Sequence, residues 1–205
     1  LVAAGSLTLA QAAPLVRFRA QAMQDAVPPG TGAMAAVLGL SAAAVVAGCL
    51  EAQASFGAGS AEVVEAVNYN DPVQTVIAGS KAAVDKACEV LKAHGAKRTL
   101  PLPVSAPFHS SLMKPAAEKL KEKLAATSFA VPQIPVINNI DVAVESDPDR
   151  IREALYRQAF GPVRWVECVG AIKARGIDTL VECGPRKVLA AMVKDVGSTF
   201  EGDLV

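Results

Sequence analysis

The fold is set by residues 63–80, which read VVEAVNYNDPVQTVIAGS. The two apolar runs within this stretch, at 63–69 and 73–78, are rich in Val and typical of strands. The tripeptide Asn-Asp-Pro at 70–72 separates the runs and is typical of a turn. We therefore predict two consecutive strands joined by a short turn.

A strand and a helix are predicted on each side of this pair. The additional segments are a strand at 34–40, a helix at 41–54, a helix at 80–95 and an extended stretch at 97–104. Ser41 and Ser80 stand at the helix starts as N-caps, and Pro101 and Pro103 exclude the last stretch from a central position in a sheet. The order strand–helix–strand–strand–helix–strand over residues 31–103 is the split βαβ pattern of a ferredoxin-like unit.

The segments outside residues 31–103 predict a second, larger unit. Thr8 and Gln11 have the spacing of a capping box, so a helix is expected from Thr8 to the Pro-Pro-Gly sequence at 28–30. Further helices are expected at 111–126, 147–160, 162–175 and after Gly184, with strands at 134–140 and 179–183. Strands that alternate with helices indicate a mainly parallel sheet covered on both faces. The predicted fold class is α/β, with a small domain at 31–103 inserted into a larger one that contains 1–30 and 104–205.

Composition excludes several classes of protein. The chain has 205 residues, of which 52% are hydrophobic and 20% are charged, so it is not a disordered chain. The 20 Lys and Arg balance the 20 Asp and Glu, and aromatic residues make up 4%, which argues against nucleic-acid binding. Four Cys without a Cys-x-x-Cys pair indicate a reduced, cytoplasmic location, and two His without metal-ligand spacing predict no metal site.

Two uncharged stretches resemble targeting or membrane segments, but we assign both to the folded chain. No basic region precedes residues 1–16, so we reject a signal peptide. Residues 32–50 are long enough to span a bilayer, but Gly39 and Ser41 interrupt them. We expect a buried strand followed by a buried helix there, and no membrane association.

Few residues could carry out chemistry, and His109 is the first candidate. It lies in PFHSS at 107–111, in a loop directly before a predicted helix. A neutral imidazole can accept a proton near pH 7, so His109 is either a general base or an ordinary loop histidine. The other histidine, His94, stands at an exposed helix end, where we expect no catalytic role.

Helical geometry makes Arg19 the second candidate. At about 100° per residue, the first helix gathers apolar side chains on one arc, formed by Val16, Ala20, Met23 and Val27. Arg19 lies inside this arc, whereas Arg17 lies on the polar arc. A guanidinium that points inward needs an anionic partner, because burying it unpaired is costly. That partner is either a structural Asp or Glu or the carboxylate of a ligand, and the residues alone leave both open.

A series of motifs resembles the malonyl-CoA:acyl carrier protein transacylases, an acyltransferase family of fatty acid and polyketide synthesis. The motifs are RFRAQAMQ at 17–24, GAMAAV at 32–37, NYNDP at 68–72, PLPVSAPFH at 101–109, VINN at 136–139 and ECGP at 182–185. Their order and spacing agree with the family along essentially the whole chain. Each motif alone is weak, and only their combination is specific.

The resemblance implies transfer of a malonyl group from malonyl-CoA to the phosphopantetheine thiol of acyl carrier protein, through a seryl ester. It implies that His109 activates the serine, that the carbonyl of Gln158 orients His109, and that Arg19 holds the free malonyl carboxylate. Phe108 fits the malonyl type and disfavours a branched extender. The implied fold is an α/β-hydrolase-like larger subdomain with the ferredoxin-like insert, without a cofactor of its own, and we expect a monomer.

One motif of the family is absent from the 205 residues. The resemblance requires a Ser in a Gly-His-Ser-Leu-Gly elbow, which would lie a few residues before Leu1. The chain thus resembles the C-terminal two-thirds of such an enzyme, and we expect it to be inactive alone. Two hypotheses stay open. Either the chain supplies the acid–base and substrate-binding part of a transacylase, or it is a non-catalytic remnant that binds CoA or a carrier.

Basic side chains are candidates for docking the carrier, because acyl carrier proteins are generally acidic. The candidates are Lys114, Lys119, Lys123 and Arg186. Acidic residues are interleaved with them, so an ordinary solvated surface is the competing interpretation.

Overall fold

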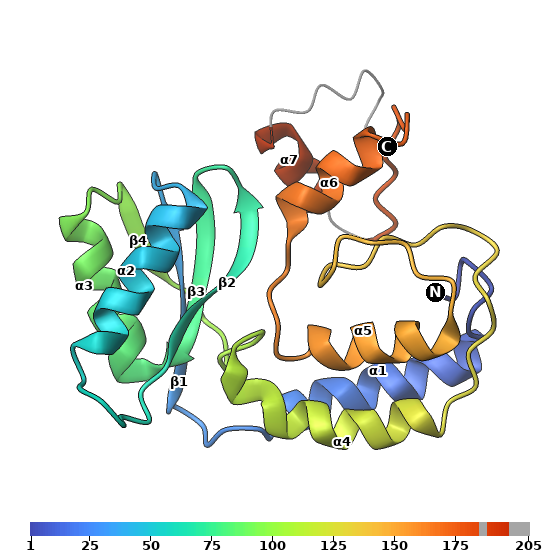
Figure 1. Cartoon of the computed structure of the whole chain (residues 1–205), viewed down its shortest axis with the longest axis horizontal. Helices are drawn as coiled ribbons and strands as arrows, with labels where there is room; N and C mark the ends of the chain where they lie inside the picture. Colours follow the sequence, from blue (N-terminus) through green and yellow to red (C-terminus); the bar gives the residue numbers. More distant parts are fainter. Residues whose placement is uncertain (185–187, 197–205) are drawn as a thin grey trace.

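A four-stranded antiparallel sheet forms one end of the protein (Figure 1). The computed structural model describes residues 1–184 and 188–196. The strands are β1 (Gly32–Leu38), β2 (Val64–Asp71), β3 (Gln74–Ser80) and β4 (Arg98–Pro101), in the order β2-β3-β1-β4. Each strand–helix–strand connection skips one strand, since β3 lies between β1 and β2, and β1 lies between β3 and β4. The predicted strand pair and the edge position of β4 are confirmed.

Helices α2 (Ala42–Ala54) and α3 (Lys81–Ala93) cover one face of the sheet (Figure 1). The core between them includes Val37, Val45, Ile77, Val84, Ala87 and Leu91. The N-cap prediction is confirmed at Ser41, whose Oγ accepts the backbone N–H of Ala44 at 3.3 Å. Ser80 precedes α3 as predicted, but its hydroxyl makes no cap bond and donates to the carboxylate of Glu62. The charged carboxylate is the stronger hydrogen-bond partner.

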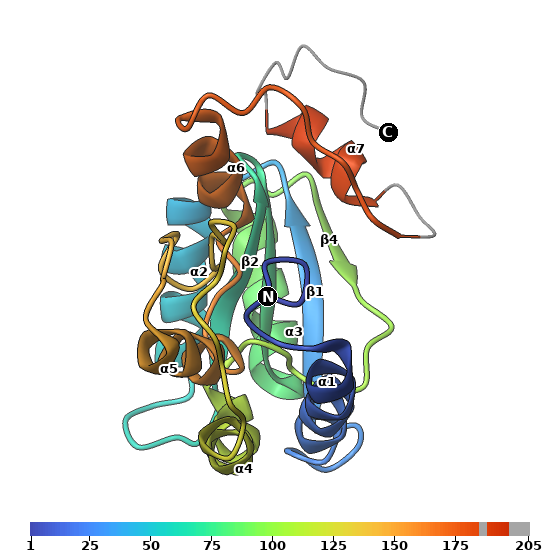
Figure 2. The same cartoon turned by 90° about the vertical axis from the view of Figure 1, so that its right-hand side faces the viewer.

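Three helices lie side by side next to the sheet, and Figure 2 looks along them. They are α1 (Leu9–Gln24), α4 (Lys114–Ala125) and α5 (Pro148–Gln158). The predicted capping box begins α1, because Thr8 N–H donates to Gln11 Oε1 at 2.9 Å and Gln11 N–H donates to Thr8 Oγ1 at 3.3 Å. A short 3₁₀ helix (Ser111–Met113) leads into α4, and α6 (Trp165–Lys173) and α7 (Val188–Asp195) contact β2.

The prediction of a mainly parallel sheet is wrong for the described residues. The pairings within the sheet are antiparallel, and parallel pairing is limited there to an isolated bridge between Asn68 and Val163. The stretches 134–140 and 179–183 are not strands. Ile134 is 56% exposed and Val181 is 63% exposed. A strand needs a neighbour that pairs with its backbone groups, and the described chain offers these stretches no more than the single bridge Ile137–Val144.

The uncharged stretch 32–50 forms β1 and most of α2, as predicted. Within the part of the chain that the structure describes, no helix combines the length and the apolar character that crossing a bilayer requires. The last helix, α7, follows Gly184, but the predicted start at Pro185 lies outside the described residues.

Candidate active site

The loop between β4 and α4 holds His109 in an unusual backbone conformation. Its φ is 65°, in the left-handed region that residues other than Gly rarely adopt. Hydrogen bonds within the loop close it, since Ser110 Oγ donates to the Pro107 carbonyl at 2.7 Å and Phe108 N–H donates to the Ala106 carbonyl at 3.0 Å. Such a conformation persists only where the surroundings hold it, and these positions cluster at functional sites.

The end of α5 orients the ring of His109. Its Nδ1 lies 3.2 Å from the backbone carbonyl oxygen of Gln158. Because a carbonyl oxygen only accepts hydrogen bonds, Nδ1 carries the proton in this contact and Nε2 keeps the lone pair. The neutral ring therefore presents Nε2 as its proton acceptor.

The surroundings of His109 favour this neutral form. Burial is the main cause that lowers the pKa of His109, and the positive charge of Arg19 lowers it further, while the Gln158 carbonyl acts in the opposite direction. The pKa thus lies below the ordinary histidine value, and the imidazole is free to accept a proton at pH 7.

Arg19 faces the same cavity as His109. This cavity, of about 440 Å³, is lined among others by Arg19 and Met23 from α1, Met34 and Asn68 from the sheet, and Phe108 and His109 from the loop. Burial lowers the pKa of Arg19. Among the described residues, no Asp or Glu forms an ion pair with Arg19. Of the two partners that the sequence left open, a structural acid is not found in the described part of the chain.

The helical wheel is only partly right about which face of α1 is buried. Val16 is 64% exposed and Ala20 is also exposed, although both lie on the apolar arc. Met23, on the same arc, is buried as expected, but so is Ala22, and Leu15 and Phe18 pack against the core that α1 shares with α4 and α5. Apolar side chains of α1 point in several directions around the helix axis, so the positions of the neighbouring helices determine which of them are buried. Arg19 lies at the margin of that face and is half-buried.

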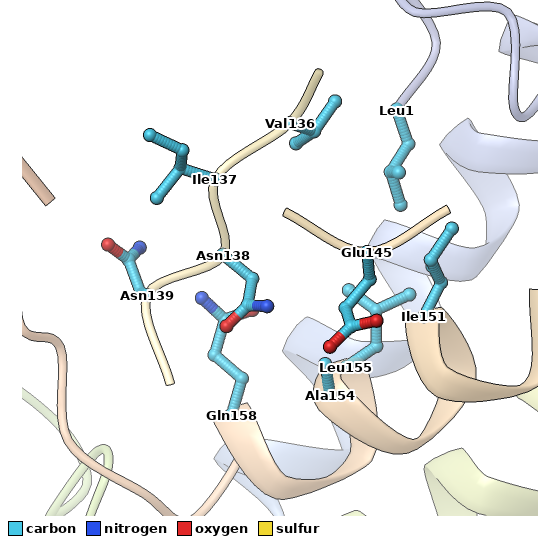
Figure 3. Close-up of a pocket in the computed structure, with 10 residues that line it drawn as sticks. All are labelled: Leu1, Val136, Ile137, Asn138, Asn139, Glu145, Ile151, Ala154, Leu155 and Gln158. Carbon is cyan, nitrogen blue, oxygen red and sulfur yellow. The ribbon is translucent and has the colours of Figure 1, made fainter. Parts of the chain in front are cut away.

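The side chain of Gln158 faces a different cavity (Figure 3). Figure 3 shows it rising from the end of α5 toward Asn138, with Asn139 and Leu155 also in the lining. The contact with His109 is made by the backbone carbonyl of Gln158. A substitution of this side chain leaves that carbonyl in place.

Several residues near His109 were missed by the sequence reasoning. Asn68 lines the cavity that Arg19 and His109 share, and Glu65 and Tyr69 line a second cavity that also reaches His109. Asn68 and Tyr69 belong to the NYNDP motif, so the motif marked the place without giving a role. Glu65 carries no sequence signal, because a charged residue in a half-buried strand is usually a solvated one.

The remaining candidates that the structure describes do not line the two cavities that reach His109. His94 pairs with Glu51, with 3.2 Å between Nε2 and Oε2, at an exposed end of α3. Lys114, Lys119 and Lys123 are exposed on α4, and Arg186 lies outside the described residues. Within residues 1–184 and 188–196, no group of His, Cys, Asp and Glu is arranged to hold a metal ion.

Known proteins resemble the chain over nearly its full length. The malonyl CoA-acyl carrier protein transacylase of Escherichia coli (strain K12) is 49% identical over 200 residues, which are 98% of this chain and 63% of that protein. The acyl-carrier-protein S-malonyltransferase structure from Burkholderia pseudomallei 1710b is 58% identical with a TM-score of 0.93, and the match covers 100% of this chain and 64% of the other.

A third match comes from a complex. In this structure, a type II PKS acyl-carrier protein is bound to its malonyl-transacylase, and the matched chain is 46% identical with a TM-score of 0.90. The match covers 96% of this chain and 62% of the other. This chain therefore spans somewhat less than two-thirds of the length of the relatives that it matches.

The family match is independent of any single relative. The acyl transferase domain family matches residues 1–202, which include His109, Arg19, Phe108 and Gln158. The chain is thus a member of the acyl transferase domain family.

Proposed function

We propose that this chain supplies the general base and the carboxylate-binding side chain for transfer of a malonyl group from malonyl-CoA to acyl carrier protein. The single observation that carries the proposal is the cavity that His109 and Arg19 share. One of these residues offers a basic nitrogen, and the other offers a guanidinium without an acidic partner among the described residues. A ligand with both a reacting carbonyl and a free carboxylate would use both groups.

In the proposed reaction, His109 accepts a proton at Nε2 from a serine hydroxyl, and the serine oxygen attacks the thioester carbon of malonyl-CoA. The carbon–sulfur bond breaks, and the CoA thiolate takes the proton from His109 as it leaves. The phosphopantetheine thiol then loses its proton to Nε2 and attacks the ester carbon, the carbon–oxygen bond of the ester breaks, and His109 returns the proton to the leaving serine oxygen. The carbonyl of Gln158 would hold the ring in the tautomer that these steps need.

Arg19 is proposed to bind the malonyl carboxylate throughout both steps. Its planar fork can donate two parallel hydrogen bonds to a carboxylate, which a lysine cannot reproduce. Phe108 lines the same cavity and packs against the sheet beside Met34. We infer that its ring leaves little room for a branch on the acyl group.

The serine nucleophile of this proposal lies outside the 205 residues, which contain no Gly-x-Ser-x-Gly sequence. We further propose that residues 31–103 are a ferredoxin-like subdomain inserted into an α/β-hydrolase-like one formed with 1–30 and 104–205. The proposed partner is an acidic acyl carrier protein, which would approach the exposed lysines of α4.

Two preparations would test the proposed function. The 205-residue chain and a form extended at its N-terminus by a segment with the Gly-x-Ser-x-Gly elbow are each incubated with malonyl-CoA and holo acyl carrier protein. Intact-mass measurement then detects the malonyl ester and the malonyl-carrier. We expect both products only with the extended form. A malonyl ester on the 205-residue chain would overturn the assignment of the nucleophile.

A second candidate function, drawn from the sequence alone, competes with this proposal. This candidate is a non-catalytic remnant that binds CoA or a carrier. An extended form that binds malonyl-CoA but transfers nothing would support it, as would an intact mass of the natural protein that leaves no room for the elbow.

A further inference from the structure

A carboxylate from the sheet holds the chain directly after His109. The backbone N–H of Ser111 donates to Oε2 of Glu65 at 2.6 Å, although the two residues are separated by 46 positions in the sequence. Glu65 is the second residue of β2 and lines a cavity together with His109 and Tyr69. The bond is short, as expected for a charged acceptor.

The His109 loop needs contacts with other elements, because its own hydrogen bonds close it without fixing its place. Those internal bonds join Ser110 to Pro107 and Phe108 to Ala106. Three side-chain hydrogen bonds reach outside the loop: His109 meets the Gln158 carbonyl, the Ser111 N–H meets Glu65, and Ser105, earlier in the loop, donates to Gln24 of α1 at 2.6 Å. His109, whose backbone is left-handed, makes the contact with Gln158 itself and stands two residues before the N–H that Glu65 accepts, so Glu65 opposes its relaxation toward a common conformation.

We infer that Glu65 is a positioning residue for His109. By accepting the Ser111 N–H, it keeps the loop where Nδ1 of His109 meets the Gln158 carbonyl and Nε2 stays available. The inference deepens the proposed function, on which its catalytic meaning rests. The positional claim itself concerns only the ring of His109 and can be measured without substrate.

The tautomer of His109 reports its position directly. The chain contains two histidines, so nitrogen-detected NMR of a histidine-labelled sample gives two ring systems. His94, at the end of α3, serves as the internal control. At mildly alkaline pH, the neutral ring of His109 is expected as the Nδ1–H tautomer in the unchanged chain, because only that form donates to Gln158.

Three variants separate the hydrogen bond from the charge. Glu65→Ala removes the acceptor, Glu65→Gln keeps a carbonyl acceptor without the charge, and Ser111→Pro removes the donor. Proline is tolerated at position 111, because the preceding Ser110 is extended, with φ −89° and ψ 166°, and position 111 is the first of the 3₁₀ helix. Glu62→Ala is the matched control, since it removes a carboxylate that bonds to Ser80, away from the loop.

Glu65→Ala is expected to lower the ratio of Nδ1–H to Nε2–H tautomer of His109 about tenfold, near the lower limit for losing a hydrogen bond to a charged group. Ser111→Pro should lower the ratio by the same factor. Combining Glu65→Ala with Ser111→Pro should add little, because the two substitutions remove the same hydrogen bond. Glu65→Gln should retain most of the ratio. The Glu62→Ala variant and the His94 signals should not change.

The inference is wrong if Glu65→Ala and Ser111→Pro both fold, by melting and by the His94 signals, and leave the His109 ratio unchanged. An equal fall of the His109 ratio in Glu62→Ala would also overturn it, because the cause would then be a general weakening of the fold. An equal fall in Glu65→Gln would overturn it too, because the charge alone would then be the cause. In the extended form, Glu65→Ala should lower kcat for malonyl transfer by up to about tenfold without changing KM. If NMR gives the expected shift but no form transfers malonyl groups, the proposed function fails and the positional inference stands.

Discussion

Replacing Arg19 by Ala tests the substrate assignment most directly, and the structure gives the size of the effect. The guanidinium is half-buried in the cavity of His109, and the described residues offer it no acidic partner. In Arg19→Ala, a bound malonyl carboxylate would lose its charged donor. Leaving a desolvated charge unpaired costs roughly 2–5 kcal/mol, and the partial exposure of Arg19 places the loss in the lower part, about 2–4 kcal/mol. At about 1.4 kcal/mol per tenfold, this is roughly a 30- to 700-fold loss.

The assay compares malonyl-CoA with acetyl-CoA, which has no free carboxylate. We expect kcat/KM for malonyl transfer by the extended form to fall by that factor in Arg19→Ala, with acetyl transfer unchanged or improved. Arg19→Lys should recover only part of the loss, because a lysine cannot form the two parallel hydrogen bonds. Arg17→Ala is the matched control, since Arg17 lies on the same helix and is exposed. Calorimetric binding of malonyl-CoA to the 205-residue chain gives the same comparison without a nucleophile.

The result that would refute this reasoning is an equal loss for both acyl groups. A structural role for Arg19 would produce that result, together with a lower melting temperature. We expect the melting temperature of Arg19→Ala to stay close to that of the unchanged chain, because no described ion pair is lost and burial already disfavours the charge.

Three further predictions concern the base, its pH dependence and the carrier. In the extended form, His109→Ala should suppress acylation about 10²–10⁴-fold with substrate binding retained. The acylation rate of Gln158→Ala should stay within a few-fold of the unchanged rate, because the backbone carbonyl of residue 158 makes the contact with His109. Normal acylation by His109→Ala would remove His109 as the base. The pKa of His109 is lowered by burial and by the Arg19 charge, so the rate should rise with pH through a midpoint below the ordinary value of about 6.5 and then level off, and the midpoint should move up in Arg19→Ala. Because the folded pKa of His109 is lowered, the free energy of unfolding should be highest above about pH 6.5 and should fall as the pH drops toward that lowered pKa. Melting curves between pH 5 and pH 8 would show this fall. A midpoint of the rate profile above pH 6.5 would contradict the lowered pKa. Lys119→Glu with Lys123→Glu should raise KM for the carrier and leave KM for malonyl-CoA alone, and an unchanged, salt-independent carrier KM would favour the solvated surface.

Local signals predicted much of the secondary structure. Thr8 and Ser41 act through side-chain hydrogen bonds to N–H groups three residues on, and Pro101 of β4 acts through the N–H it lacks, so their effects can be read from nearby residues. The order of strands and helices at 31–103 also followed from local patterns, and it permits the observed sheet order.

Features that depend on distant neighbours could not be predicted in this way. Val16 is exposed because α4 and α5 cover another part of α1, and an isolated helical wheel contains neither helix. The stretch 134–140 has the composition of a strand, but pairing requires a second segment that the described chain does not bring to it. The bond between Glu65 and Ser111 joins two elements that only the folded chain brings together.

The two edges of the sheet bear on the solubility of the protein. At one edge, β4 is four residues long and contains Pro101 and the exposed Arg98. At the other edge, Val163 pairs with the outer side of β2. Its N–H donates to the Val67 carbonyl at 2.8 Å, and its carbonyl accepts the Tyr69 N–H at 2.9 Å. Short, charged, proline-containing edges and edges already covered by the chain both resist the addition of a foreign strand. Strand-mediated aggregation through this sheet is therefore opposed at both ends of its hydrogen-bond ladder.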